Sequence, residues 1–431
     1  MKRSIAAAML AATAVPAFAQ EAVSAGDTAW LLTSTALVLF MSLPGLALFY
    51  GGLVRAKNVL SVLVQCFAIV CVVSVLWLVG VYSLAFGPGN GFIGGLSKAF
   101  FSGVGEDSVS GSVPETVFAM FQLTFAAITP ALVVGGFAER MKFSAILLFS
   151  SLWLIAVYAP VCHWVWSSDG WLFKLGLLDF AGGTVVHITA GVAALVAAMK
   201  LGHRNGFLQT PMMPHNMTMT VTGAGMLWVG WFGFNGGSAL AANGNAGMAI
   251  MVTHISAAAG ALMWSAIEWV KYGKPSALGI VTGMVAGLGT ITPASGYVGP
   301  GGALLIGLAA GFVCFFATHG LKRVLKIDDS LDVFPVHGVG GMLGTFAAGI
   351  FASSSLGVFS GQGYAEGFTM SRQLGVQLLG IGATAAYTAL LTWGLLKLVD
   401  VMVGLRVSAE HESLGLDTTQ HNERGYDLQG L

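Results

Sequence analysis

The sequence predicts an all-α polytopic membrane protein of eleven transmembrane helices, arranged as an inverted five-helix repeat plus one long peripheral helix. The first observation is composition: 56% of the 431 residues are hydrophobic and 9% are charged, whereas soluble domains carry roughly 25% charged residues. The second is the recurrence, from Thr28 to Val403, of apolar stretches close to the ~20 residues that cross a bilayer. The third is a pair of matching units, DFAGGTVVHITAG from Asp179 and DDSLDVFPVHGVG from Asp329.

The first 19 residues have the features of a secretory signal. Lys2 and Arg3 precede an Ala-rich apolar run, and Ala17-Phe18-Ala19 forms an A-x-A cleavage site. The alternative is an uncleaved extra helix, but the run is short and ends at Pro16. We therefore expect residues 1–19 to be a signal peptide and the mature N-terminus to lie outside the cytoplasm.

Eleven apolar stretches follow the predicted signal and define a membrane domain over residues 20–403. They are Thr28–Gly52, Asn58–Phe86, Pro114–Phe137, Phe143–Trp166, Gly182–Gly202, Asn216–Leu240, Ala246–Val270, Ser276–Thr292, Val298–Gly320, Val333–Ala352 and Ser371–Val403. The last stretch has no partner in the repeat and is long enough to lie tilted across the outside of the bundle. The polar segment 404–431 is predicted to be a cytoplasmic tail.

The distribution of Lys and Arg supports this count and sets the orientation. With an external mature N-terminus, the odd-numbered connections and the tail hold 14 of the 19 Lys and Arg residues. The signal holds two more, which leaves Lys98, Lys174 and Arg372 outside. Cytoplasmic connections carry an excess of these residues, so the pattern predicts a multi-pass membrane protein, in contact with lipid, with its tail in the cytoplasm. The net charge of zero makes nucleic acid an unsuitable partner.

Each of the two matching units places a His eight residues after an Asp, at the start of the fifth or the tenth stretch: His187 after Asp179, and His337 after Asp329. A five-helix unit has the opposite orientation when it is repeated, and inverted repeats place a transport path at their interface. Ionisable residues inside a membrane are costly and mark such paths. The alternative is that each His is a satisfied interior residue at a helix–helix contact.

Aromatic residues gather near the external ends of the predicted helices. They are Phe121, Phe125, Trp166, Phe180, Trp231, Phe232 and Phe234. Any one of them could belong to the interfacial aromatic belt. Together they also suit a vestibule that attracts a small cation, an interaction worth about 2 kcal/mol when desolvated.

A path of aromatic rings and two imidazoles favours a cation that sheds its proton and crosses as a neutral molecule. Moving a bare ion into a low-dielectric interior costs on the order of 20 kcal/mol before relaxation. Ammonium can lose a proton, whereas potassium cannot. The four cysteines have no CxxC spacing, so the sequence predicts neither a metal site nor a cofactor.

The units and several further segments resemble the ammonium transporter (Amt/Mep/Rh) family, in particular its bacterial Amt branch. The resemblance covers nearly all of the predicted mature chain and includes ALFYGGLVRAKNVLS, FAERMKFSA, GWFGFNGGSA, GYVGPGGALLIG, DVFPVHGVGG and VGLRVSAEHESLGLD. It implies a homotrimer in a bacterial inner membrane. Each protomer would have one pore, which would conduct ammonium, ammonia and methylammonium. A PII-type regulatory protein on the cytoplasmic face is a further implied partner.

The resemblance also implies roles for individual residues. Trp166, Phe125 and Ser238 would recruit ammonium at the outer site, and Phe125 and Phe234 would stack as a gate beneath it. His187 and His337 would be the twin histidines of the pore. The residues implied to support the site are Asp179, Phe121, Gln122 and Trp231. Among these, Asp179 is expected to cap the fifth helix rather than bind ammonium.

Two departures from the family pattern are Pro335, where Gly is often expected, and Lys200, where an apolar residue is commoner. Two other classes of function compete with transport. Gly236-Gly237-Ser238-Ala239 loosely matches a G-x-S-x turn of a serine hydrolase, but Ser238 is predicted to lie further out than the histidines. A sensor that signals without flux would need a cytoplasmic partner. We therefore expect a transporter and not an enzyme.

Overall fold

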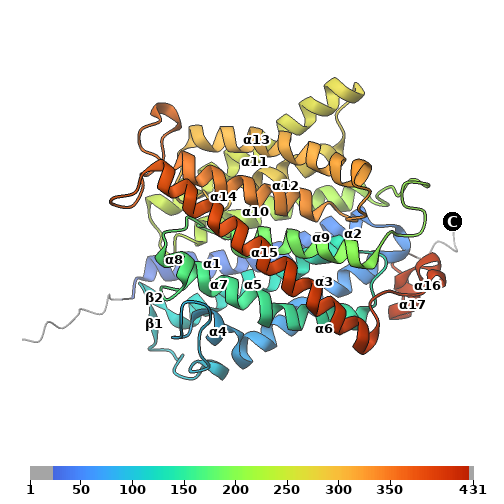
Figure 1. Ribbon diagram of the computed structural model, residues 1–431, viewed down its shortest axis with the longest axis horizontal. Helices are drawn as coiled ribbons and strands as arrows, with labels where there is room; N and C mark the ends of the chain where they lie inside the picture. The colour runs from blue at the N-terminus through green and yellow to red at the C-terminus, as the bar shows by residue number, and fades with distance from the viewer. Residues whose placement is uncertain (1–22, 427–431) are drawn as a thin grey trace, which may run out of the picture.

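The computed structural model describes residues 23–426, so the predicted signal peptide lies outside the described residues. Long helices lie side by side in one bundle and run between two ends (Figure 1). The end that carries the short hairpin of β1 (Val109–Ser110) and β2 (Val113–Pro114) is called the hairpin end. The opposite end, which carries α16 (Ala409–Leu414) and α17 (Leu416–His421), is called the tail end.

The first half of the chain forms five helical segments long and apolar enough to cross a membrane. Their helices are α1 (Ala25–Phe40), α2 (Ala47–Leu53), α3 (Val59–Leu76), α4 (Tyr82–Phe86), α5 (Glu115–Phe137), α6 (Phe143–Trp153), α7 (Ala159–Trp166) and α9 (Thr189–Leu201). Four π-helical turns continue or open these segments: Met41–Leu46, Trp77–Val81, Leu154–Tyr158 and Gly183–Ile188. Such turns inside long helices are frequent at functional sites.

The second half forms the remaining membrane helices. They are α10 (Met217–Gly237), α11 (Gly244–Tyr272), α12 (Ala277–Ile291), α13 (Pro300–His319), α14 (Gly340–Phe351) and α15 (Met370–Val403), with π-helical turns at Gly320–Val324 and Phe334–Val339. Within residues 23–426, nine helical segments meet the length and hydropathy expected of a span. The sixth and eighth predicted spans correspond to α10 and to the 15-residue apolar α12, which fall outside those nine. The all-α polytopic fold is therefore confirmed, and the count of eleven spans stays a prediction.

The connections contain only short elements. Within residues 23–426 they are the β1–β2 hairpin, α8 (Trp171–Lys174) and single 3₁₀ turns at Ala56–Asn58, Ala99–Phe101 and Gly357–Phe359. Small residues let the long helices approach closely. A Cβ atom on Gly260 of α11 would collide with the carbonyl oxygen of Gly283 on α12, so this helix contact requires glycine.

The longest helix, α15, crosses the outside of the bundle diagonally (Figure 1). Only 22% of its most apolar 18-residue window is buried. Its inner face carries amides that satisfy backbone groups of the bundle: Gln377 Nε2 donates to the carbonyls of Leu178 and Thr345, both at 2.8 Å. The prediction of one long peripheral helix agrees with this arrangement.

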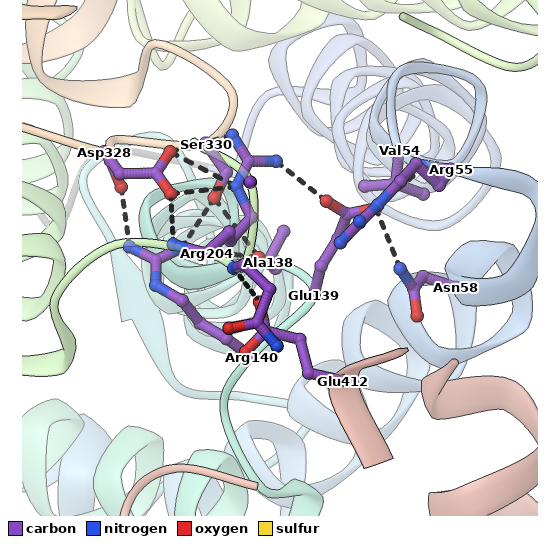
Figure 2. A network of polar contacts seen from close by, with 12 residues as sticks. Val54, Arg55, Asn58, Ala138, Glu139, Arg140, Arg204, Asp328, Ser330 and Glu412 are labelled. Carbon is purple, nitrogen blue, oxygen red and sulfur yellow. Dashed lines mark hydrogen bonds and ion pairs between the residues drawn. The ribbon is translucent and has the colours of Figure 1, made fainter. Parts of the chain in front are cut away.

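A buried network of charges holds the loops of the tail end together (Figure 2). Glu139 follows α5 and accepts hydrogen bonds from Arg55 Nε at 2.9 Å and Arg204 Nη1 at 2.8 Å. Arg204 also donates from Nη2 to Asp328 Oδ1 at 2.8 Å. The three loops that follow α2, α5 and α9 therefore meet the loop before α14 around one set of ion pairs.

Burial and neighbouring charges shift the pKa values of these groups in opposite directions. Burial raises the pKa of Glu139, but the positive charges of Arg204 and Arg55 outweigh it and lower that pKa to about 2. The carboxylates of Glu139 and Asp328 likewise raise the pKa of Arg204 against the effect of burial. The charged forms of both residues are therefore strongly favoured.

The tail is docked on this network rather than free. Glu412 accepts a hydrogen bond from the backbone N–H of Asn205 at 2.6 Å. Asp417 accepts from the N–H groups of Leu60 at 3.1 Å and Ser61 at 2.7 Å, which are unpaired donors in the first turn of α3. The sequence predicted a polar tail, and the structure adds that it contains two short helices packed against the loops.

Candidate functional site

The two Asp-to-His units fold alike, since each begins with a π-helical turn that contains its His. Asp179 closes the first turn by accepting hydrogen bonds from the N–H groups of Gly182 at 2.8 Å, Gly183 at 2.5 Å and Thr184 at 2.8 Å, and from the Thr184 hydroxyl. Gly182 has φ of +118°, a conformation that favours glycine. The carboxylate is thus saturated by the first turn, as expected for a cap.

The corresponding acid of the second unit has fewer partners. Asp329 Oδ2 accepts from the N–H of Phe334 at 2.7 Å, and its Oδ1 has no hydrogen-bond partner among the described residues. Burial, together with the negative charge of the neighbouring Asp332, raises the pKa of Asp329 to about 7. The two halves of the repeat therefore share a backbone geometry but differ in electrostatics.

The structure brings the two histidines together. His187 Nδ1 lies 3.1 Å from His337 Nδ1, and the rings are nearly parallel, with centroids 5.2 Å apart and an interplanar angle of 15°. Both side chains are buried. A hydrogen bond between two Nδ1 atoms requires one of them to donate and the other to accept, so the two rings share one proton at this contact. His187 Nε2 has no partner among the described residues and is free to bind a small molecule.

Aromatic rings cover the pair on the hairpin side. Trp231 stacks on His187 at a centroid distance of 5.5 Å and is fixed by a hydrogen bond from Nε1 to Thr292 Oγ1 of 2.8 Å. Phe234 lies 6.1 Å from the His187 ring and 4.3 Å from Phe125. The rings of Phe125 and Phe234, which were predicted to form a gate, are thus in contact and lie between the histidines and the space beyond.

That space is a cavity of about 250 Å³ at the hairpin end. Its lining consists of Phe86, Phe118, Gln122, Val165, Trp166, Phe173, Leu177, Asp179, Phe180, Ser238, Leu240 and Tyr297. Trp166 stands 5.5 Å from Phe125 at an angle of 88° and donates from Nε1 to the carbonyl of Asp179 at 3.0 Å. Phe121 lies behind Phe125 at 5.0 Å.

Two polar side chains of this cavity are suited to a cation. Gln122 is nine-tenths buried and its Oε1 has no hydrogen-bond partner among the described residues. The Ser238 hydroxyl donates to the carbonyl of Phe234 at 2.8 Å, which leaves its lone pairs for a donor in the cavity. All the residues predicted to recruit a cation therefore line or adjoin one cavity.

One of the seven aromatics from the sequence analysis lies elsewhere. Phe232 packs 6.0 Å from His254 of α11 and not in the cavity. It follows Trp231 by one residue, and successive residues of a helix face different directions. Proximity to a helix end was the wrong criterion here, and helical phase separates Phe232 from Trp231 and Phe234.

A second cavity, of about 210 Å³, reaches His337 from the tail end. It is lined by Tyr50 and Val336 near the histidine and by charged groups further out. Lys322 and Asp332 form an ion pair there at 2.8 Å. The sequence analysis did not assign Tyr50, Lys322 or Asp332 to the site, because nothing local indicates that α2 and the loop before α14 face the same cavity.

Neither a metal site nor a hydrolase site is formed by the described residues. No group of three or more His, Cys, Asp and Glu side chains is placed to hold a metal ion within residues 23–426. Ser238 donates to a backbone carbonyl and makes no hydrogen bond with a histidine in that range. The arrangement is instead a series of features: a cavity, two phenylalanine rings in tilted contact, two paired imidazoles and a second cavity.

Comparison with known proteins gives a consistent result. The sequence model of the Ammonium Transporter Family matches residues 29–426. An ammonium transporter of Bacillus subtilis is 46% identical over 403 residues, which cover 93% of this chain and 98% of that protein. The ammonium transporter Amt1 of Archaeoglobus fulgidus is 48% identical over 406 residues, 94% of this chain and 100% of that protein.

Solved structures are similar over the same range. The crystal structure of Saccharomyces cerevisiae Mep2 superimposes with a TM-score of 0.82 at 39% identity, covering 90% of this chain and 92% of that one. A structure described as a sensor Amt protein has a TM-score of 0.85 at 30% identity and covers 92% of this chain and 98% of that one.

Proposed function

Because this chain belongs to the ammonium transporter family, we propose that it carries ammonium across a bacterial inner membrane as ammonia, after removing a proton. The relatives transport ammonium and are not enzymes, which rules out the hydrolase alternative. The cation is recruited at the hairpin-end cavity, loses a proton near the Phe125–Phe234 gate, and passes the paired histidines into the tail-end cavity.

The observation that carries this mechanism is the pairing of His187 and His337 through Nδ1 atoms 3.1 Å apart. The pair offers ammonia a hydrogen-bond partner in an otherwise apolar path, and it can relay the proton by a change of tautomer. It offers no negative charge to a bare potassium ion. Selectivity thus comes from the need to shed a proton.

The test is ammonium-driven current and uptake in vesicles that contain the purified protein. The wild type should give both signals. A double variant, His187→Ala with His337→Ala, should still fold but lose the current, because the polar track is gone while the cavity remains. Full electrogenic transport by this variant would show that the histidines are only packing residues. A wild type without flux would instead favour a sensor, the function named for one structural neighbour.

Trp166→Leu should weaken recruitment of ammonium and methylammonium. The change removes an indole face from the hairpin-end cavity, and a desolvated cation–π contact is worth about 2 kcal/mol. We expect the half-saturating concentration to rise about 30-fold. Trp393→Leu on the peripheral α15, where the side chain is 42% exposed, is the matched control and should leave that concentration unchanged. An unchanged value for Trp166→Leu would place Trp166 in the interfacial belt.

Phe125→Ala should alter gating more than folding. The ring stands 4.3 Å from Phe234 across the path, so its removal joins the hairpin-end cavity to the histidines. Methylammonium flux should change by about tenfold, the factor that corresponds to ~1.4 kcal/mol. Phe137→Ala, at a fully buried position further along α5, should lower stability without that change in flux. Dissociation of the oligomer in Phe125→Ala would mark Phe125 as a packing residue.

A homotrimer is part of the proposal, and one feature of the lateral surface supports an oligomer. His254 lies exposed on α11, between the rings of Trp228 at 5.2 Å and Phe232 at 6.0 Å. An imidazole that faces acyl chains is costly, and a second copy of the chain would cover it. The native mass of the detergent-solubilised protein tests this.

The remaining parts of the proposal concern topology and regulation. The N-terminus is periplasmic after cleavage of residues 1–19, and the tail end is cytoplasmic. The basic residues of that end agree with the positive-inside rule. A PII-type regulator would approach the same end, where the docked tail and the connections offer charged groups.

A further inference from the structure

One buried histidine has no part in the transport path. His163 lies in α7, three residues before Trp166, and its side chain is fully buried. Its Nδ1 is 2.9 Å from the carbonyl oxygen of Ala85, and its Nε2 is 2.7 Å from the carbonyl oxygen of Asn90. Both partners are acceptors. A neutral imidazole has one donor and one acceptor nitrogen, whereas an imidazolium has two donors.

We propose that His163 is an imidazolium, and that this buried cation is a positioning residue which fastens the segment Gly87–Gly95 and the end of α4 to α7 beside the recruitment cavity. With either neutral tautomer, one carbonyl oxygen would face a nitrogen lone pair at hydrogen-bond distance in a site without exposed surface. That contact is repulsive and leaves a buried acceptor unpaired. The doubly protonated ring satisfies both acceptors at once.

The surroundings favour a cation. Ala85 lies in the last turn of α4, where unpaired carbonyls and the helix dipole carry partial negative charge. The Asn90 carbonyl, whose oxygen accepts from Nε2, adds a second dipole directed at the ring. Hydrogen bonds to charged donors are about twice as strong as those between neutral groups.

The charged groups on the neighbouring elements are paired among themselves. On the α4 side, Glu115 accepts from Tyr82 Oη at 2.6 Å and pairs with Lys98. After α7, Asp169 pairs with Lys174 at 3.6 Å. The Asp179 carboxylate is saturated by its own turn, and the nearby Tyr158, Cys162 and Tyr387 carry no negative charge when protonated. Among the described residues His163 forms no ion pair with a carboxylate, so the two carbonyls are its direct partners.

The segment that His163 holds is also joined to α4, where the Gly94 N–H donates to the Leu84 carbonyl at 2.8 Å and Ser83 Oγ donates to the Gly95 carbonyl at 2.7 Å. Its turn is closed locally, because Asn90 Oδ1 accepts from the N–H groups of Phe92 at 2.8 Å and Ile93 at 3.1 Å. Two further bonds join it to α7 and α8: Trp164 Nε1 donates to the Phe92 carbonyl at 2.7 Å, and the Trp171 N–H donates to the Gly91 carbonyl at 3.0 Å. Three adjacent hydrogen bonds therefore join this segment to α7 and α8, and the one donated by the imidazolium is the one with a charged donor.

The attachment of α4 to α7 through His163 also affects the shape of the recruitment cavity, an inference that rests on the proposed function. Ala85 is followed by Phe86, which lines the cavity, and His163 precedes Trp166, which lines it from the other side. Holding the Ala85 carbonyl against α7 therefore sets the distance between two walls. Loss of the His163 proton would release the wall formed by Phe86 at the end of α4. Cation binding should then weaken, whereas the gate and the histidine pair should not change.

The protonation state can be measured without any substitution. Cys162-His163 is the one Cys-His dipeptide in the sequence, so labelling cysteine carbonyls with ¹³C and histidine with ¹³C and ¹⁵N assigns the His163 signals in the full-length protein in lipid vesicles. Solid-state NMR at pH 7.5 should show hydrogen on both ring nitrogens. A ring with one unprotonated nitrogen overturns the proposal, whatever the outcome of the flux assays.

Hydrogen exchange tests the positioning role. In His163→Gln, whose amide can donate to only one of the two carbonyls at a time, exchange in residues 87–95 should be at least about tenfold faster than in the wild type. The half-saturating methylammonium concentration should rise at least about threefold while the maximal rate is kept. His254→Gln is the control and should leave exchange in residues 87–95 unchanged. Equal protection of this segment in His163→Gln and the wild type overturns the positioning role. If His163→Gln does not fold, the same exchange is measured on the wild type across the pH range in which NMR shows the ring losing its proton, and it should accelerate there.

Discussion

A carboxylate at either paired histidine should make the transporter permeable to potassium. His187 and His337 are buried and face each other at 3.1 Å, with no negative charge between them. His187→Asp or His337→Glu would put an anion in the path, and an anion favours a whole cation by Coulomb attraction. Potassium has no proton to shed, so it crosses only if the path accepts an intact ion.

The measurement is potassium current or uptake beside ammonium in vesicles, each against the wild type. His187→Asn and His337→Gln are matched controls, because they have nearly the same shape as the acidic variants and no charge. They should exclude potassium. If the acidic variants conduct ammonium and still exclude potassium, the aromatic gate or the pore diameter sets selectivity. The proton chemistry proposed for the histidine pair would then be wrong.

Arg204→Met should destabilise the protein by about 3–5 kcal/mol, the cost of removing one partner from a buried ion pair. Arg204 is 7% exposed and joins Glu139 to Asp328, which are almost inaccessible to solvent. Without the guanidinium, two carboxylates lose their main partner in a dry site. Because this network ties three loops and the docked tail together (Figure 2), we expect a lower midpoint of thermal unfolding and earlier release of the tail.

Lys174→Met is the control, since its ion pair with Asp169 is exposed and 3.6 Å long; exposed pairs contribute about 0–1 kcal/mol.

The pH dependence of the unfolding midpoint gives a second check. The pKa of Glu139 is lowered from 4.5 to about 2, so its stabilisation is fully present above about pH 4.5 and is lost as the pH falls through about 2. Arg204→Met should remove most of this dependence. Equal midpoints for Arg204→Met and the wild type would mean that the network contributes no net stability.

Much of the fold was predictable because hydropathy is a local property. The structure places the fifth and tenth spans at Gly183–Leu201 and Phe334–Phe351, within two residues of the ranges expected from the sequence. Two of the predicted spans stay predictions: α12 is apolar but has only 15 residues, and the glycine-rich α10 is not among the nine segments that meet the length and hydropathy of a span. The short helices α16 and α17 were not expected, because their stability comes from partners far away in the chain.

The sequence by itself determined the membrane-spanning class, the positions of the long helices and the identity of the two histidines, since these depend on runs of residues and on two similar units. Only the tertiary structure decided that the histidines meet through their Nδ1 atoms and that Phe232 turns away from the cavity. The same holds for the contacts of Arg204 with Glu139 and Asp328, which are 65 and 124 residues distant in the chain. Such contacts join residues with no common local pattern. Their hydrogen bonds exist only once the packing of the helices has fixed the distances and removed the water.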